Sequence, residues 1–195
     1  MSDDAGILLV AGLGNPGERY ERTRHNAGFW FVDRVASQYH GTFCRESRFF
    51  GEVCRVDVAG VAVRLLKPAT MMNRSGQSVC AMASYFDVPS ERILVVHDEI
   101  DLPPGTSRLK RGGGHGGHNG LRDIISCLGK SFWRLRLGVG HPGHRDQVVN
   151  YVLSRASRGE EDIILDDVDE ALALMPQLSA GDMERAMHCL HTMDT

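Results

Sequence analysis

Short apolar runs alternate along the chain with stretches whose apolar residues recur at helical spacing. Residues 7–11 and 93–96 are continuous apolar runs, which are typical of buried strands. Residues 29–39 and 79–86 instead place apolar side chains three or four positions apart, as on one face of a helix. This alternation predicts strands that are covered by helices.

The rest of the chain continues the alternation. Residues 51–58 and 61–66 flank an Ala59-Gly60 turn and predict a hairpin. Residues 106–109 and 135–139 predict further strands, and residues 121–128 a helix between them. Ser157 and Glu160 form a capping box ahead of apolar positions that run to Met175, and a last helix carries Met183 to Leu190. The predicted fold is α/β, a mixed twisted β-sheet flanked by α-helices.

Length and composition limit the class of protein. A chain of 195 residues suits one domain spanning 1–195, with the acidic C-terminal helices at 158–192 as part of it. No apolar run approaches the ~18 residues that span a bilayer, and the N-terminus lacks the features of an export signal, so we expect a cytoplasmic protein. The five cysteines are scattered without a Cys-x-x-Cys pair, which predicts reduced thiols and no zinc site.

The net charge of −3 conceals a strong division along the chain. Between Arg108 and Arg136, seven Lys or Arg against one acid give +6, whereas from Gly159 to the end ten acids against one Arg give −9. A basic cluster beside a glycine-rich loop suits a polyanion. The alternative is that these charges only solvate the faces of the domain.

The segment Gly12-Leu13-Gly14-Asn15-Pro16-Gly17 follows the first predicted strand and matches the dinucleotide-binding fingerprint. In such a fold the glycines lead directly into a helix that binds pyrophosphate. Pro16 removes one amide donor and disfavours a helical Asn15, and the helix is expected to begin only near Asn26. A loop that presents the Asn15 side chain is therefore favoured over a nucleotide site.

Candidate catalytic groups follow two of the predicted strands. His25 lies where the first loop meets the first helix, and Asp98 comes just after the strand at 93–96. Groups at the carboxyl ends of parallel strands converge on one crevice. There the carboxylate would fix the imidazole tautomer while the other ring nitrogen takes a proton from water. The alternative is a surface histidine and one of several solvated acids.

Two asparagines and a glycine run offer binding groups. Asn73 and Asn119 suit a peptide backbone or an oxyanion, although each could instead cap the helix that follows it. Five glycines within 112–117 indicate a close backbone approach, and the flanking cations suggest that a phosphate or an RNA end approaches. His115 and His118 have no third ligand at a recognisable spacing, so we expect no metal.

Taken in order, these motifs resemble the bacterial peptidyl-tRNA hydrolase family over residues 7 to about 153. The resemblance implies a monomeric single-domain α/β enzyme without metal or cofactor, which acts on an N-blocked peptide esterified to the terminal ribose of tRNA. The motifs are Gly12 to Gly17 with Tyr20, Arg24-His25-Asn26, Met72-Asn73 with Ser75-Gly76, Asp98 to Pro103, Gly112 to Gly120 and Gly138 to Gly143.

The resemblance also implies roles for individual residues. His25 is the base that activates water, and Asp98 orients it. Asn73 and Asn119 hold the peptide and the attacked carbonyl or water, Asn15 and Met72 line the cleft, and His118 lies near its entrance. Lys110 and Arg136 clamp the 5′ phosphate of the tRNA, and Tyr20 belongs to the substrate-binding set. Met71, where an aromatic is common, and the extra cation Arg111 depart from the pattern.

Three alternatives belong to other classes. A non-catalytic RNA-binding relative would keep the basic surface, but retention of His25, Asp98 and the three asparagines argues against it. A nucleotide-dependent oxidoreductase rests on the glycine fingerprint alone. A serine or cysteine hydrolase is disfavoured because the chain has no Gly-x-Ser-x-Gly elbow and no cysteine with an evident base partner.

Overall fold

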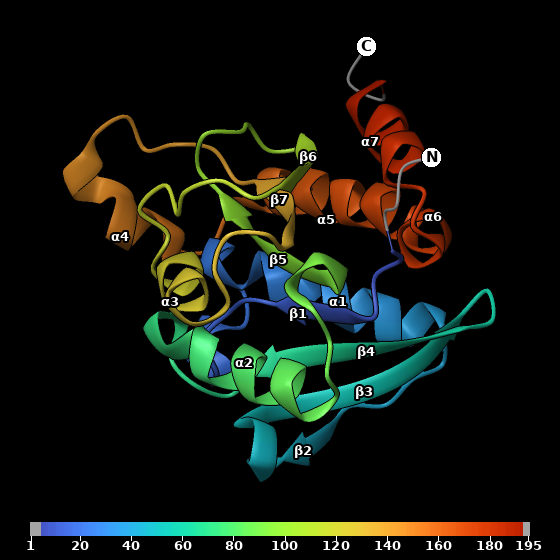
Figure 1. The fold of residues 1–195 in the computed structure, drawn as a ribbon. Helices are drawn as coiled ribbons and strands as arrows, with labels where there is room; N and C mark the ends of the chain where they lie inside the picture. The colour runs from blue at the N-terminus through green and yellow to red at the C-terminus, as the bar shows by residue number, and fades with distance from the viewer. Residues whose placement is uncertain (1–4, 193–195) are drawn as a thin grey trace.

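The computed structural model describes residues 5–192, which contain one seven-stranded sheet of order β2-β3-β4-β1-β5-β7-β6 (Figure 1). The sheet is mixed, because β1 pairs in parallel with β4 and β5, and β5 with β7, while the β2/β3, β3/β4 and β6/β7 pairs are antiparallel. The strands are β1 (Leu9–Gly12), β2 (Cys44–Glu46), β3 (Gly51–Val58), β4 (Val61–Pro68), β5 (Ile93–Glu99), β6 (Ser107–Arg111) and β7 (Trp133–Gly138).

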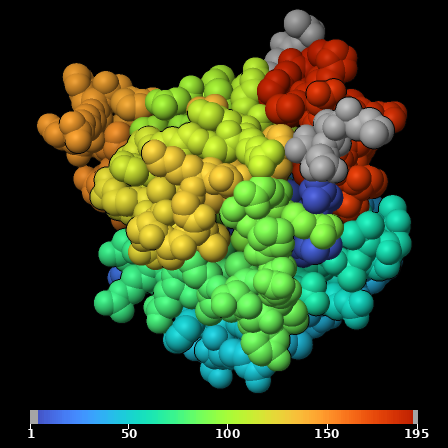
Figure 2. Space-filling view, in the orientation of Figure 1, coloured from blue at the N-terminus to red at the C-terminus, as the bar shows by residue number. Residues whose placement is uncertain are grey.

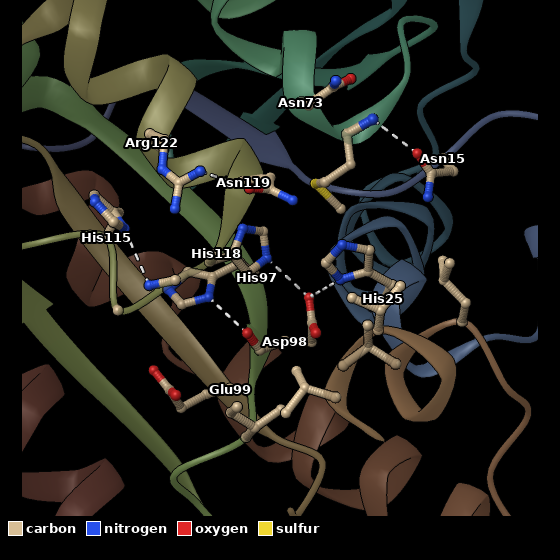
Figure 3. Close-up of a pocket in the computed structure, with 18 of the residues that line it drawn as sticks. Asn15, His25, Asn73, His97, Asp98, Glu99, His115, His118, Asn119 and Arg122 are labelled. Atoms are coloured by element: carbon tan, nitrogen blue, oxygen red, sulfur yellow. Dashed lines mark hydrogen bonds and ion pairs between the residues drawn. The ribbon is translucent and has the colours of Figure 1, made fainter. Parts of the chain in front are cut away.

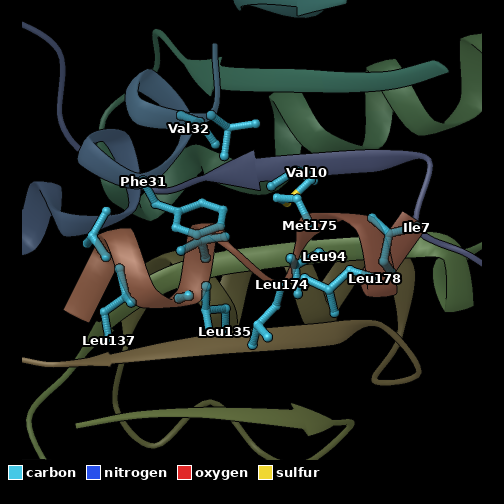
Figure 4. Close-up of a cluster of buried hydrophobic side chains, with 14 of the residues drawn as sticks. Ile7, Val10, Phe31, Val32, Leu94, Leu135, Leu137, Leu174, Met175 and Leu178 are labelled. Carbon is cyan, nitrogen blue, oxygen red and sulfur yellow. The ribbon is translucent and has the colours of Figure 1, made fainter. Parts of the chain in front are cut away.

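Helices cover both faces of this sheet, and each face has its own core. In Figure 1, α2 and α3 lie in front of the sheet, and α1 and α5 lie behind it. The larger core joins α1, α5, α6 and α7 to one face, where Phe31, Leu94 and Met175 are fully buried (Figure 4). The smaller core packs Met82 and Ile124 against the other face. The helices are α1 (Ala27–Gln38), α2 (Ser75–Tyr85), α3 (Asn119–Leu128), α4 (Val148–Val152), α5 (Arg158–Leu172), α6 (Met175–Ala180) and α7 (Met183–Thr192).

The chain order places a crevice at the carboxyl end of β1. From β1 the chain passes through α1 on one face to β4 on one side, and then through α2 on the other face to β5 on the opposite side. Such a reversal of direction leaves a crevice beyond the strand ends, where ligands bind in open α/β sheets. The segments that leave β1, β4 and β5 all enter this region.

Two glycines allow α1 to approach the sheet closely at this point. A Cβ on Gly12 would lie 2.2 Å from the carbonyl oxygen of Gly28, and one on Gly28 would lie 2.3 Å from that of Val96. Both distances are well below contact, so any larger side chain would push the start of α1 away from β1 and β5. The glycine at the end of β1 thus serves helix packing.

Most of the predicted elements are confirmed. The 59–60 turn has positive φ at both residues, 52° and 87°, as a two-residue hairpin of type I′ requires. The helix after the first loop begins at Ala27, and the capping box of Ser157 and Glu160 is formed. The strand predicted at 93–96 continues to Glu99, so Asp98 lies within β5 rather than after it. The sequence pattern did not predict β2, α4 or a separate α6.

The prediction that all five cysteines are reduced is wrong for one pair. A disulfide joins Cys80 of α2 to Cys127 of α3, whereas Cys44, Cys54 and Cys189 are free thiols. The two partners are 47 residues apart in sequence and come together only because α2 packs against α3.

None of the helices within residues 5–192 combines the length and the hydropathy that crossing a membrane requires.

Candidate active site

A cleft of about 560 Å³ opens beyond the carboxyl ends of β1 and β5. One wall is the segment that contains α4, which stands out from the body of the molecule as the orange lobe of Figure 2. The other walls are the Asn15 loop, the turn before α2, and the glycine-rich loop with the start of α3. Lining residues that carry functional groups include Asn15, His25, Asn73, His97, Asp98, Glu99, His115, His118, Asn119 and Arg122, which Figure 3 labels.

The predicted dyad forms at the floor of this cleft. His25 lies in a 3-10 turn (Arg24–Asn26) directly before α1, and its Nδ1 is 2.8 Å from Oδ1 of Asp98. Burial lowers the pKa of His25, but the charge of Asp98 and the hydrogen bond between the two outweigh burial, so this pKa is raised. Burial raises the pKa of Asp98, but its two histidine partners lower it further, so the carboxylate is ionised and can only accept. Nδ1 of His25 is therefore the donor, and Nε2 has the lone pair.

A second histidine donates to the same oxygen. Nε2 of His118 lies 3.0 Å from Oδ1 of Asp98, and Figure 3 shows the rings of His25 and His118 turned toward this one atom. The His118 side chain is only 10% exposed, so it lies on the cleft floor. The family resemblance had placed it near the cleft entrance. His97 packs edge-on against it with ring centroids 5.0 Å apart. Burial, His118 and Arg134 lower the pKa of His97 to about 3.

The Asn15 loop is fixed by a reciprocal pair of hydrogen bonds. The backbone N–H of Asn15 donates to Oδ1 of Asn26 at 2.8 Å, and Nδ2 of Asn26 donates back to the carbonyl of Asn15 at 2.9 Å. The side-chain oxygen of Asn15 accepts from the backbone N–H of Met72 at 2.7 Å. Because its oxygen is occupied, Asn15 offers the cleft its amide donor, Nδ2.

Asn73 and Asn119 also line the cleft, and neither caps a helix. The cap of α3 is His118, whose Nδ1 accepts from the N–H of Leu121, and α2 has no side-chain cap. Oδ1 of Asn119 accepts from Arg122 at 3.1 Å, which again leaves Nδ2 as the available donor. Asn73 is exposed and lies at the rim, at the top of Figure 3. The expectation that these side chains share one cleft with His25 is confirmed.

Three residues of the predicted set do not line the cleft. Tyr20 lies in a 3-10 turn (Glu18–Tyr20), where its hydroxyl accepts from Arg19. Lys110 lies on β6 and Arg136 on β7. Met72, in contrast, is buried against the cleft beside Gly120, and the neighbouring Met71 is 45% exposed.

A cationic strand face lies on β6 and β7, beside the glycine-rich loop. Lys110 pairs with Arg134, and Arg108 with Arg136, in the antiparallel register. Directly opposite residues project to the same side, and so do residues two apart on one strand. These four cations therefore share one face, as the charge division of the sequence predicts. Within this face Arg136 pairs with Glu99 at 2.9 Å.

The first loop could be considered as a cofactor site, and the dyad with His118 as a metal site. The loop at 12–17 leads into a 3-10 turn and not into a helix N-terminus, so it lacks the amides that hold a pyrophosphate in a dinucleotide fold. His25, Asp98 and His118 offer three ligand-type atoms within 4.8 Å of one another. Both contacts to Oδ1 of Asp98 have hydrogen-bond lengths, so ring protons satisfy this oxygen without an ion.

Sequence reasoning gave no separate role to several residues that hold the cleft together. Arg24 is buried, stacks 4.0 Å above the Tyr151 ring and donates to the carbonyls of Tyr151 and Arg155, so it fixes the α4 wall. Arg134 donates to the carbonyls of Gly113 and Gly114 and so braces the glycine-rich loop. Their motifs contain no signal for these contacts, although an arginine inside an apolar strand, as at 134, suggests a buried partner.

Comparison with known proteins identifies the family. The family model for peptidyl-tRNA hydrolase matches residues 9–195. The chain is 58% identical to the peptidyl-tRNA hydrolase of Halorhodospira halophila over 184 residues, 94% of this chain and 95% of that protein. It is 54% identical to the peptidyl-tRNA hydrolase of Pseudomonas paraeruginosa over 188 residues, which are 95% of this chain and 97% of that protein. The crystal structure from Acinetobacter baumannii superposes with a TM-score of 0.94 at 46% identity, covering 97% of each chain. The chain therefore belongs to the peptidyl-tRNA hydrolase family, a family of hydrolases.

Proposed function

We propose that the chain hydrolyses the ester bond between a peptide and the terminal ribose of tRNA, using water that His25 activates. Water attacks the ester carbonyl while Nε2 of His25 takes its proton. The carbonyl carbon then releases the ribose oxygen, which receives this proton from the His25 imidazolium; the peptide acid then ionises, so the products are free tRNA and a peptide carboxylate. No cofactor or metal takes part in this scheme.

One observation carries the proposal: of the two histidines that hydrogen-bond the Asp98 carboxylate, only His25 keeps a ring nitrogen, Nε2, without a hydrogen bond within residues 5–192, and it lines the cleft. Both nitrogens of His118 are engaged, with Asp98 and with Leu121. His97 is only 2% exposed, and a pKa of about 3 makes it a poor base near neutral pH. Asp98 holds the His25 tautomer and stabilises the imidazolium that forms.

The fixed amides support a role in binding the ester and the peptide. Asn15 and Asn119 both present Nδ2 donors, because their oxygens already accept from Met72 and Arg122. Donors held in place before the reaction suit a carbonyl oxygen that gains negative charge. Asn73 at the rim and Met72 in the wall would contact the peptide further out.

The cationic strand face supports a phosphate clamp for the tRNA. Lys110 is exposed, and its ammonium lies beside Gly113 of the glycine-rich loop. Arg136 lies diagonally across the strand pair from it. We assign these two residues to the 5′ phosphate, and Tyr20 and His118 to the substrate-binding set. We further propose that the protein acts as a monomer in the cytoplasm.

The test is release of peptide from an N-acetylated aminoacyl-tRNA by chelator-treated protein in ¹⁸O-labelled water. We expect release without added cofactor, with the label in the peptide carboxylate and none in the ribose, because water attacks the carbonyl carbon. Label in the ribose would contradict the mechanism. Binding of the tRNA without release would instead favour a non-catalytic RNA-binding role.

A further inference from the structure

One oxygen of Asp98 accepts two imidazole N–H groups. Oδ1 lies 2.8 Å from Nδ1 of His25 and 3.0 Å from Nε2 of His118, and the carboxylate itself is 2% exposed. The two rings approach from different elements, the turn before α1 and the cap of α3, with centroids 5.0 Å apart. His118 therefore belongs to the same hydrogen-bonded unit as the base.

The second nitrogen of His118 fixes its tautomer. Nδ1 accepts the backbone N–H of Leu121 at 3.3 Å, in the first turn of α3. A nitrogen that accepts has no proton, so the proton is on Nε2 and points at Asp98. With both nitrogens engaged, His118 has none to act on water, and any effect on the base passes through the carboxylate.

The neighbours of His118 hold its ring in this position. His97 packs against one side of the ring, and its Nδ1 donates to the backbone carbonyl of Asp98 at 2.8 Å. Arg134 holds the preceding loop through Gly113 and Gly114. His118 is thus aligned with Asp98 by its ring contact with His97 and by the braced loop that precedes it.

We propose that His118 is a positioning residue for the reaction, which shares Oδ1 of Asp98 with His25 and so limits how strongly this carboxylate stabilises the His25 imidazolium. The inference rests on the proposed function of His25. Each N–H that a carboxylate oxygen accepts neutralises part of its charge, and an acceptor shared by two donors attracts each of them less. A base that bound its proton too tightly would be protonated near neutral pH, so the shared acceptor keeps His25 available.

Other charged groups around the cleft define the background for this effect. Besides His25, Asp98 and His118, the titratable or charged residues that line the cleft come from β5, the glycine-rich loop, α3 and the segment before α4. They are His97, Glu99, His115, Arg122, His141 and Arg145. Arg24, next to His25 in sequence, is engaged by the α4 wall and by Glu160. Substituting His118 alone leaves these groups in place.

Two substitutions separate the two contacts of His118. An asparagine oxygen can replace the capping Nδ1 but is too short to reach Asp98, whereas a glutamine amide can replace the Nε2 donor but not the cap. His118→Asn should therefore lose the Asp98 contact and keep the cap, and His118→Gln the reverse. His115→Asn, on the same loop and without contact to Asp98, is the matched control.

The experiment is an NMR titration of the His25 ring in wild type and these variants, together with the pH dependence of kcat/KM. We expect the His25 midpoint to rise by about 0.5 pH unit or more in His118→Asn, with the acidic limb of the rate profile following it. His118→Gln and His115→Asn should stay near wild type in midpoint, although His118→Gln should melt at a lower temperature. An unchanged midpoint in folded His118→Asn would overturn the proposal and assign any loss of activity to direct substrate contact. The titration does not depend on activity, so a shifted midpoint together with an active His25→Ala would reject the function of His25 and keep its coupling to His118.

Discussion

The cleft floor, formed by Asp98 with His25 and His118, and the cationic strand face differ in how far their charged groups are buried and aligned. On the floor, Asp98 is almost fully buried, and both of its histidine partners have assigned tautomers. On the strand face, Lys110 is exposed, and Arg136 is a quarter exposed and pairs with a carboxylate that also borders the cleft. A buried, aligned group gives rate through geometry, and an exposed cation gives affinity that salt can screen.

This difference predicts that the two regions affect different kinetic constants. Substitutions on the floor should lower kcat and leave tRNA binding intact, whereas those on the strand face should raise KM and alter the response to salt.

The largest effect is expected for His25→Ala. Removing the base should lower kcat by roughly 10²-fold or more, because water then has no positioned proton acceptor. Affinity for uncharged tRNA should remain near wild type, since the imidazole contacts no phosphate. Single-turnover release and a filter-binding assay would measure the two quantities, with the exposed His188→Ala on α7 as control. A comparable loss of tRNA affinity would show that floor and face are not separate.

Asp98→Asn should lower kcat by about 10²-fold, because the tautomer of His25 is no longer fixed and its imidazolium is no longer stabilised. It should also move the acidic limb of kcat/KM. In the wild type Asp98 outweighs burial and raises the pKa of His25 above 6.5, so activity should rise with pH through this higher value. Without the carboxylate, burial prevails and the limb should move to lower pH. A limb that stays in place would mean that it reports another group.

Lys110→Ala and Arg136→Ala should each raise KM for full-length peptidyl-tRNA roughly fivefold, with a smaller change in kcat. A short ester substrate without the 5′ phosphate should show little of this loss. The slope of log KM against log salt should also fall by about one unit for a lost phosphate contact. Arg111→Ala is a suitable control, because Arg111 lies on β6 but packs over Trp133, on the other side of the sheet. Equal losses on both substrates, independent of salt, would rule out the clamp.

The smallest effect should come from a residue in neither region. Ser157→Ala removes the capping box of α5 and should lower the free energy of unfolding by about 1 kcal/mol without a change in kcat or KM. Denaturant unfolding and steady-state kinetics would measure this. A kinetic change would indicate that the α4 wall, which Arg24 links to Glu160, transmits it to the cleft.

The sequence was sufficient for the elements that depend on local signals. Apolar periodicity predicts β1, β5 and α1, and the Ala59-Gly60 turn predicts the hairpin, because these signals lie within one element or one turn. β2 has three exposed residues and therefore no apolar pattern. The continuous helix expected up to Met175 ends at Leu172, and a new helix starts at Met175 with Pro176 in its first turn.

The residues that line the cleft could be predicted in part, but the geometry of the cleft could not. His25 and Asp98 were predicted from their places after the first loop and after a buried strand, the asparagines from the chemistry of their carboxamides, and all of them from the family resemblance. The sequence gives no indication that His118 shares an oxygen with His25, or that Cys80 meets Cys127, since both contacts depend on how α3 is placed. The ten acids after Gly159 include Asp194, which lies outside the described residues. Others, such as Asp169 with Arg34, form surface ion pairs on α5.

The close packing of Gly28 against Val96 has a consequence for mutational screens. The 3-10 turn that contains His25 directly precedes α1, so a methyl group at position 28, which would meet the Val96 carbonyl at 2.3 Å, would displace the base together with the helix. A saturation screen scored on activity would rank Gly28 beside His25, although this glycine does not line the cleft. Only an abundance score on the same library would tell which intolerant positions serve chemistry and which serve the fit of helix to sheet.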